Sequence, residues 1–340
     1  SLADAVEYAR QRRQVFELPP VRPYVTEHQL VSLQCEDCGQ VTEADSPAGV
    51  MGRVQYGPGV KAAVTYGRGA QFLPHQRVAR LLADLLGVEV SVGFAHQVIS
   101  EAVRRLGPFV SHVAAALHLQ KVLHVDETPT RVDGKLKYVH VACTDSLPLF
   151  HVGGRAAADV DAGGVLPGFD GTLVRDGYAA YQHLVDADHA WCGAHLLRDL
   201  RGVHESDPQR QSWAEYMANT LLIDKRMTEQ ALTDGQDRLT DEQLRFIRSA
   251  YAGAIAQGRA ENPPDRSGQL PRAGKLVERF ATHRDMILRF TLDLAVPFTN
   301  NQAERDLRPV KLQQKSSATW RTLQGLADFA TLRSYLSTAA

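Results

Sequence analysis

The sequence is poor in cysteine and in lysine, and it lacks any long apolar segment. Four cysteines in 340 residues are too few for a disulfide scaffold, so we expect a reducing compartment. No apolar run approaches the roughly 18 residues of a membrane helix, and no signal peptide opens the chain. We therefore expect neither a membrane protein nor a secreted disulfide-rich one, and we expect a cytoplasmic location.

The chain also lacks a net charge that could attract nucleic acid as a whole. Its 38 Lys and Arg nearly balance its 39 Asp and Glu, which leaves a formal charge of −1. Any contact with DNA must therefore come from local basic patches. Arginine outnumbers lysine 30 to 8, and GC-rich coding explains this bias as well as phosphate recognition does.

The remaining composition is that of a globular protein with several domains. Apolar residues make up 44% and charged residues 23% of the sequence, and its length allows two or three cores. The chain starts at Ser1 without Met and stops inside an apparent helix, so we expect both ends to be cut.

A Cys-x-x-Cys motif, Cys35 to Cys38 followed by Gly39, lies in a Pro- and Gly-rich region with short strand-like pieces. This spacing is half of a zinc knuckle, and tetrahedral zinc needs two more ligands. Three alternatives stay open: a partner pair ahead of Ser1, a ligand from His28, or a hairpin without metal.

Residues 73–106 have helical periodicity interrupted by a short turn. Gly87 is expected to end the first helix and Ser91 to cap the second. The outline fits a helix-turn-helix, in which His96 and Arg104 of the second helix would contact DNA, but it fits an ordinary helical hairpin equally well. The expected apolar faces consist of Val78, Leu81, Leu82, Leu85 and Leu86 in the first helix and Phe94, Val98 and Val103 in the second.

From residue 121 the hydrophobic period becomes two, which is typical of strands. Two strands flank the turn pair Asp133-Gly134, a third covers 147–152, a fourth 171–176 and a fifth 188–192. A helix is expected from about Tyr178, and residues 195–260 are almost wholly helical in pattern. Three antiparallel strands followed by αβ units predict an α/β (α+β) fold, an RNase H-like mixed sheet with a helical insertion.

Three acids stand at positions where chemistry is plausible. Asp126 ends the first core strand, Asp176 ends the fourth, and Glu304 follows on a helix that Asn300 or Asn301 is expected to cap. Such a trio can hold two Mg²⁺ ions, or Mn²⁺, for in-line phosphoryl transfer. Taken singly, each acid is more readily explained as a cap, a turn residue or a solvated charge.

The segment 296–317 sets this one glutamate ahead of a row of cations. A helix stabilised by its own salt bridges would contain several acids rather than one. The cations are therefore expected to contact DNA phosphates. They are Arg305, Arg308, Lys311 and Lys315.

Four stretches, "HVDET", "VRDGYAAY", "WCGAHLLRDL" and "TNNQAERDLRPVK", resemble the blocks of DDE transposases of the insertion-sequence-sixty-six family, in order from about Val15 to the end. The resemblance implies a retroviral-integrase-like core whose catalytic residues match Asp126, Asp176 and Glu304. It also implies an N-terminal zinc knuckle, where Glu36 replaces a common proline. The stretch "KSSATWRTLQG" departs from the family's Ser-Gly-x-x-x-Ser pattern.

These observations predict five segments along the chain. Residues 1–56 form a β-rich segment with the half knuckle, 57–120 a helix-turn-helix-like domain, and 121–204 the first part of the core. Residues 205–295 form the helical insertion and 296–340 the closing helices with Glu304.

Cys192 and His195 also have zinc-like spacing, and His195 and Asn301 are expected to line the active site.

The predicted function is a bacterial, nucleoid-associated DNA transposase that cleaves the ends of an insertion sequence and joins them to target DNA. Its expected partners are terminal-repeat and target DNA, with at least a dimer on the DNA as the family resemblance implies. Two Mg²⁺ or Mn²⁺ ions are the expected cofactors, with Zn²⁺ at Cys35 and Cys38 as an option. The alternatives are an RNase H-like nuclease without strand transfer and a silent DNA-binding remnant.

Overall fold

The computed structural model describes residues 5–317 and 319–339. They divide into two compact units. The first consists of residues up to Arg68 together with Pro74–Val98, and the second of Gly69–Leu73 together with residues from Ile99 onward. Within these described ranges no helix is both long and apolar enough to cross a membrane.

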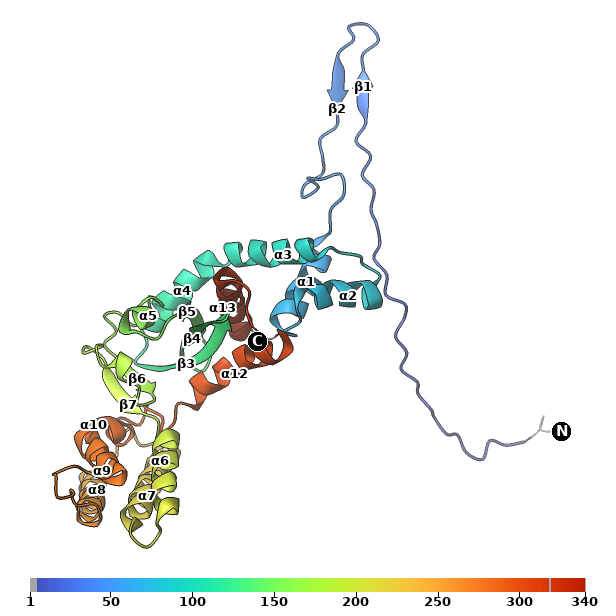
Figure 1. The fold of residues 1–340 in the computed structure, drawn as a ribbon. Helices are drawn as coiled ribbons and strands as arrows, with labels where there is room; N and C mark the ends of the chain where they lie inside the picture. The colour runs from blue at the N-terminus through green and yellow to red at the C-terminus, as the bar shows by residue number, and fades with distance from the viewer. Residues whose placement is uncertain (1–4, 318, 340) are drawn as a thin grey trace. The chain divides into compact units, whose positions relative to one another are not determined.

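The first unit begins with an extended, exposed segment that carries one small hairpin (Figure 1). Strands β1 (Ser32–Gln34) and β2 (Val41–Glu43) pair antiparallel around a turn that contains Cys35 and Cys38. Gly39 adopts a φ of 71° and its N–H donates to the C=O of Cys35 across 2.9 Å. The positive φ explains why glycine follows the second cysteine.

Three helices follow: α1 (Pro58–Gly69), α2 (His75–Leu86) and α3 (Val92–Arg105), the first and last of which run into the second unit. Gly87 ends α2 in the left-handed conformation, with a φ of 63°. The hydroxyl of Ser91 accepts the N–H of Phe94 across 3.0 Å at the start of α3. Both predicted helix boundaries are therefore confirmed.

The expected apolar face of α2 is partly wrong. Val78 and Leu82 are buried, whereas Leu81 and Leu85 are 38% and 64% exposed. Val78 packs against Gly67 of α1, where a Cβ would lie 3.3 Å from its methyl group. A small helical unit buries one narrow line of each helix, so the outer leucines stay in solvent.

The second unit is built around a five-stranded sheet of order β5-β4-β3-β6-β7. Strands β3, β4 and β5 are antiparallel, and β6 and β7 continue the sheet parallel to β3. This mixed sheet among many helices confirms the predicted α/β class. The strands are β3 (Val122–Val132), β4 (Lys135–Cys143), β5 (Pro148–Gly153), β6 (Thr172–Arg175) and β7 (Asp188–Trp191).

The predicted hairpin turn at Asp133-Gly134 is confirmed. Both residues have positive φ, 49° and 72°, and Val132 pairs with Lys135 across the turn. These angles are those of the two-residue turns that match the twist of a hairpin.

The helix expected from about Tyr178 is wrong, since only the short 3₁₀ turn η1 (Ala179–Tyr181) forms there. The carboxylate of Asp176 accepts the N–H of Tyr178 across 2.8 Å. The guanidinium of Arg175 donates to the C=O groups of Asp176 and Tyr178 across 2.8 and 3.1 Å. These side-chain bonds occupy backbone groups that a helix would use for itself.

Helices cover both faces of the sheet. On one face α4 (Gly107–His118) and the short α5 (Ala157–Asp161) pack against Leu123 and Leu173. On the other face α12 (Asn301–Ser317) and α13 (Leu323–Thr338) pack against Val139 and Val141 (Figure 1). The sheet is therefore the middle layer of three, as a sheet with two apolar faces requires.

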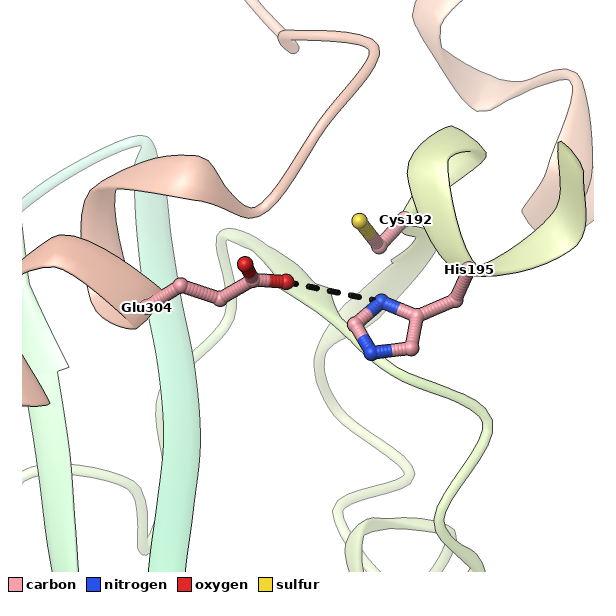
Figure 2. Close-up of side chains that lie close together, drawn as sticks. All are labelled: Cys192, His195 and Glu304. Atoms are coloured by element: carbon pink, nitrogen blue, oxygen red, sulfur yellow. Dashed lines mark ion pairs between the residues drawn. The ribbon is translucent and has the colours of Figure 1, made fainter. Parts of the chain in front are cut away.

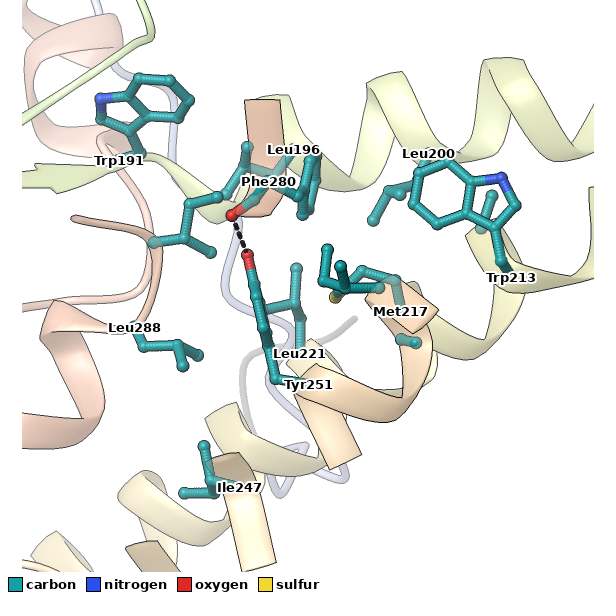
Figure 3. Close-up of a cluster of buried hydrophobic side chains, with 14 of the residues drawn as sticks. Trp191, Leu196, Leu200, Trp213, Met217, Leu221, Ile247, Tyr251, Phe280 and Leu288 are labelled. Atoms are coloured by element: carbon teal, nitrogen blue, oxygen red, sulfur yellow. Dashed lines mark hydrogen bonds between the residues drawn. The ribbon is translucent and has the colours of Figure 1, made fainter. Parts of the chain in front are cut away.

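The predicted helical block lies between β7 and α12 and has a core of its own (Figure 3). Trp213 and Tyr251 are fully buried there, and the Tyr251 hydroxyl donates to the C=O of Phe280 across 2.9 Å. Thr240 and Gln243 form a capping box at the start of α8. The helices are α6 (Gly193–Ser206), α7 (Ser212–Thr233), α8 (Asp241–Glu261), α9 (Arg272–Thr282), α10 (Arg284–Ile287) and α11 (Arg289–Leu292).

Candidate active site

Asp126 and Asp176 occupy matching positions on neighbouring parallel strands. The last residue pair between β3 and β6 is His124 with Val174, and each aspartate lies two residues further along the chain. Asp176 directly follows β6, whereas the prediction that Asp126 ends its strand is wrong, because β3 continues to Val132 in its hairpin with β4. Asp126 also stands opposite Val141 of β4, so it shares the sheet face that α12 covers. The sheet thus presents the two carboxylates at one edge of one face.

Glu304 reaches the same face from the first turn of α12. The residue before this helix, Asn300, is buried and fixed to β3: its amide donates to the C=O of Val125 across 2.8 Å and its carbonyl oxygen accepts from His124 Nδ1 across 2.9 Å. The Asn300 side chain is therefore used to anchor α12 to β3. The prediction that the Asn300 side chain caps α12 is wrong, because this side chain is hydrogen-bonded to β3.

A second pair of contacts ties the start of the helical block to its end. The N–H of Gly193 donates to the C=O of Phe298 across 2.8 Å, and the N–H of Asn300 donates to Cys192 Sγ across 3.2 Å. A Cβ on Gly193 would lie 2.2 Å from the ring of Phe298, so only glycine allows this approach. The backbone therefore leaves for the helical block and returns from it at one point.

The other two acids act on Asp126 electrostatically, although the ligand atoms of the three acids do not all lie within 4.8 Å of one another. Burial, followed by the charges of Glu127, Asp176 and Glu304, raises the pKa of Asp126 to about 7, although the N–H of Glu127 opposes this. Carboxylates that repel one another in a partly buried place need a cation or a proton. The three acids offer only oxygen atoms, which are the ligands that Mg²⁺ and Mn²⁺ prefer.

The buried side chain of Arg175 fixes the turn that carries Asp176. The Arg175 Nε donates to His189 Nδ1 across 2.8 Å, and His189 Nε2 therefore donates to the C=O of Leu184 across 3.1 Å. Burial and then the charge of Arg175 lower the pKa of His189 to about 4, which keeps the ring neutral. A fully buried arginine thus holds the turn that carries Asp176.

Sequence reasoning missed Glu127, whose side chain is only 3% exposed beside Asp126. It accepts a hydrogen bond from Tyr181 across 2.9 Å and forms an ion pair with Arg155, also at 2.9 Å. The guanidinium of Arg155 lies 3.8 Å from the ring centre of Tyr178. Glu127 thus links β3 to the turn after Asp176. The sequence signal for Glu127 is its place in "HVDET", directly after Asp126.

Figure 2 shows His195, from the first turn of α6, facing Glu304, with Cys192 beside it. His195 Nδ1 lies 3.6 Å from Glu304 Oε1, and one ligand atom of each of the three residues lies within 4.8 Å of the others. The nearby thiol of Cys192, and then the charge of Glu304, raise the pKa of His195. His195 therefore adjoins Glu304, whereas Asn301 is exposed at the start of α12.

The predicted DNA-binding residues lie on exposed helix surfaces. Arg305, Arg308, Lys311 and Lys315 are all exposed along α12, and none forms an ion pair with an acid among the described residues. On α3 both His96 and Arg104 are exposed, and the His96 ring lies 5.4 Å from that of His75. These positions leave the cations of α12 available to an anionic partner.

Cys35 and Cys38 are exposed free cysteines in the turn of the β1–β2 hairpin. Over residues 5–317 and 319–339, Cys192, His195 and Glu304 form the one group of three or more residues arranged to hold a metal ion. Among the described residues, Cys35 and Cys38 are therefore not part of a group of three or more possible metal ligands, and zinc at this turn stays a prediction.

Comparison with known proteins identifies the family. Residues 53–328 match the family model described as Transposase IS66 family. The chain is also similar to the uncharacterized protein y4qI of Sinorhizobium fredii (strain NBRC 101917 / NGR234), with 29% identity over 186 residues. That match covers 51% of this chain and 33% of y4qI, so the chain spans about a third of this curated relative. Because the family model covers most of the sequence, including all three acids, the chain belongs to the Transposase IS66 family.

Proposed function

We propose that this protein is a DNA transposase that cleaves the ends of an insertion sequence and transfers the freed strands to target DNA. One observation carries the proposal: the three acids stand on β3, directly after the neighbouring strand β6, and in the first turn of α12, which packs on the face formed by β3 and β4. The order of three antiparallel and two parallel strands supports an RNase H-like core around them.

Asp126, Asp176 and Glu304 are the residues that would hold the metal ions. Glu304 Oε1 is buried without a hydrogen-bond partner among the described residues, and the charges of neighbouring acids raise the pKa of Asp126, both of which favour a bound cation. The ligand atoms of the three acids do not all lie within 4.8 Å of one another, so a metal ion would have to draw them together. When bound, two Mg²⁺ or Mn²⁺ ions would activate the attacking oxygen and stabilise the leaving oxygen of the phosphodiester. Three further residues hold the backbone that carries the acids in position: Asn300, Arg175 and Glu127.

DNA is the partner that the family and the α12 surface both favour. The exposed cations Arg305, Arg308, Lys311 and Lys315 follow Glu304 on the same helix, so they can bind phosphates on either side of the scissile bond. We assign residues 57–120, with His96 and Arg104, to recognition of the element ends. Pairing two ends requires at least a dimer, acting in the bacterial nucleoid.

The test is a cleavage and strand-transfer assay with the full-length protein, Mg²⁺ or Mn²⁺, and duplexes carrying the repeats that flank its gene. Asp126→Asn, Asp176→Asn and Glu304→Gln should each reduce cleavage by at least about 100-fold while DNA binding persists. Full cleavage by one variant would remove that residue from the site. Cleavage without joined products would establish a nuclease, and binding without cleavage by the unaltered protein would establish a silent remnant.

A further inference from the structure

We propose that Cys192, His195 and Glu304 form a site for a thiophilic divalent cation of the zinc class, distinct in its chemistry from the three-acid site but sharing Glu304 with it. The three residues belong to two elements that meet at the start of α6 and the first turn of α12 (Figure 2).

The geometry needs little adjustment to close around one ion. Zinc bonds of about 2.0–2.1 Å to nitrogen and oxygen at a tetrahedral angle place those two atoms about 3.3 Å apart. His195 Nδ1 and Glu304 Oε1 are already 3.6 Å apart, and the third ligand atom, of Cys192, lies within 4.8 Å of both. Three protein ligands leave a fourth position open for water or a DNA oxygen.

The donor set selects the class of metal. One sulfur, one imidazole nitrogen and one carboxylate oxygen suit Zn²⁺ and similar ions, whereas Mg²⁺ prefers oxygen alone. Cys192 and His195 are separated by two residues across the first turn of a helix, a spacing that brings both side chains to one side.

Two of the three ligand atoms have no hydrogen-bond partner outside this group of three in the described structure. His195 Nδ1 and Glu304 Oε1 are both buried and both lack a hydrogen-bond partner among the described residues. At 3.6 Å they are too far apart to satisfy each other. Cys192 Sγ is held in place by the N–H of Asn300 at 3.2 Å, a contact that a metal-bound thiolate keeps. A cation between them would satisfy both orphaned atoms.

The shared residue gives the site a consequence that rests on the proposed function. Glu304 cannot face His195 and Cys192 through a tightly bound zinc ion and also move freely among Asp126 and Asp176. Zinc should therefore inhibit cleavage that Mg²⁺ or Mn²⁺ supports. Binding itself requires no activity, so the two parts can be tested separately.

The binding test is a titration of the full-length protein with Co²⁺, followed by its visible and near-ultraviolet absorption. Cys35→Ser and Cys38→Ser are introduced first, because the exposed hairpin cysteines could also bind the probe. We expect one equivalent of Co²⁺ to give tetrahedral bands and a thiolate charge-transfer band. Cys192→Ser should abolish the thiolate band, and His195→Gln should weaken Co²⁺ binding at least about 10-fold.

Cys143→Ser is the matched control, since Cys143 is also buried but belongs to the core between β4 and α12. Circular dichroism of each variant establishes that it is folded. Absence of the thiolate band from the folded parent, or its persistence after Cys192→Ser, would overturn the site.

The inhibition test adds Zn²⁺ to the Mg²⁺-supported cleavage reaction. The half-inhibitory Zn²⁺ concentration should rise at least about 10-fold in Cys192→Ser, relative to that variant's own activity with Mg²⁺ alone. Equal inhibition of both proteins would overturn the shared use of Glu304. A thiolate–Co²⁺ site in a protein that cleaves no DNA would support the metal site while contradicting the proposed function.

Discussion

The side-chain amide of Asn300 donates a hydrogen bond to the backbone carbonyl of Val125 across 2.8 Å. Val125 immediately precedes Asp126, and Asn300 lies one turn before Glu304. The bond therefore sets the distance between the helix that carries one acid and the strand that carries another. Since the same Asn300 side chain also accepts from His124, one residue fixes both the position and the direction of the α12 start.

Asn300→Ala should lower both stability and cleavage. It leaves a buried C=O and a buried imidazole N–H unpaired, which costs on the order of 2–4 kcal/mol of unfolding free energy. Cleavage should fall by roughly 10- to 100-fold because Glu304 loses its support. Chemical denaturation and cleavage rates measure the two effects. Asn219→Ala, at an exposed position of α7, is the control and should change neither.

Tyr181→Phe should reduce cleavage about 10-fold, because the hydroxyl that holds Glu127 beside Asp126 is lost. Glu127→Gln should have a similar effect, since it weakens the ion pair with Arg155. If the two residues act as one unit, the double variant will be no slower than the worse single variant. Fully additive losses in this cycle would contradict a shared role. Tyr335→Phe, on α13, serves as the phenol control.

Replacing Arg305, Arg308, Lys311 and Lys315 together by Gln should weaken DNA binding mainly at low salt. Each phosphate contact contributes about 0.9 to the slope of log affinity against log salt, so the slope should shrink by about 3–4. The measurement is fluorescence anisotropy over a series of salt concentrations. Arg245→Gln with Arg248→Gln, on the exposed side of α8, controls for a general loss of charge. An unchanged slope would mean that the α12 cations are only a solvated face.

Asp224 of α7 should make stability depend on pH. It is fully buried, neither carboxylate oxygen has a partner among the described residues, and burial raises its pKa to about 7. Its ordinary pKa is 3.8, so between these values the folded protein binds more protons than the unfolded one. The unfolding free energy should therefore fall as pH rises from about 4 to about 7, by on the order of 4 kcal/mol at most.

The check is chemical denaturation of the parent and of Asp224→Asn at about pH 5 and about pH 8. The variant should gain more stability at the higher pH, where the parent carries the buried charge. Asp237→Asn, in the exposed loop before α8, should leave the pH dependence unchanged. An equal gain at both pH values would show that the protonation of Asp224 does not change between them, which would contradict the raised pKa.

The sequence predicted features that depend on local patterns. Alternating apolar residues located the strands, the Asp133-Gly134 pair located their turn, and the cap at Ser91 followed from residue type. The family resemblance added Asp126, Asp176 and Glu304 as catalytic residues, which remains a prediction. The structure adds how the elements that carry them are arranged: β6, which Asp176 follows, pairs with β3, and α12 packs on the face formed by β3 and β4.

Contacts between distant segments escaped prediction because no local pattern records them. Asn300 and Val125 are 175 positions apart, and the bond from Tyr181 to Glu127 spans 54 positions. The 3₁₀ turn after Asp176 depends on a buried arginine that reads as an ordinary surface charge in the sequence. Leu81 and Leu85 were placed in a core because periodicity shows which side of a helix is apolar but not how much of it is covered.

The helical block is closed by the contact between Gly193 and Phe298. The positions of the three acids therefore do not depend on the length of that block. Residues 193–298 depart and return beside each other, joined by the hydrogen bond from Gly193 to Phe298 and by the contact from Asn300 to Cys192, so the chain enters α12 at the point where it left the core. Lengthening a closed loop adds only a slowly growing entropic cost, about 0.6 kcal/mol for each doubling. A block of another length, with other surface residues, could therefore be joined at the same two residues without moving the backbone that carries the three acids.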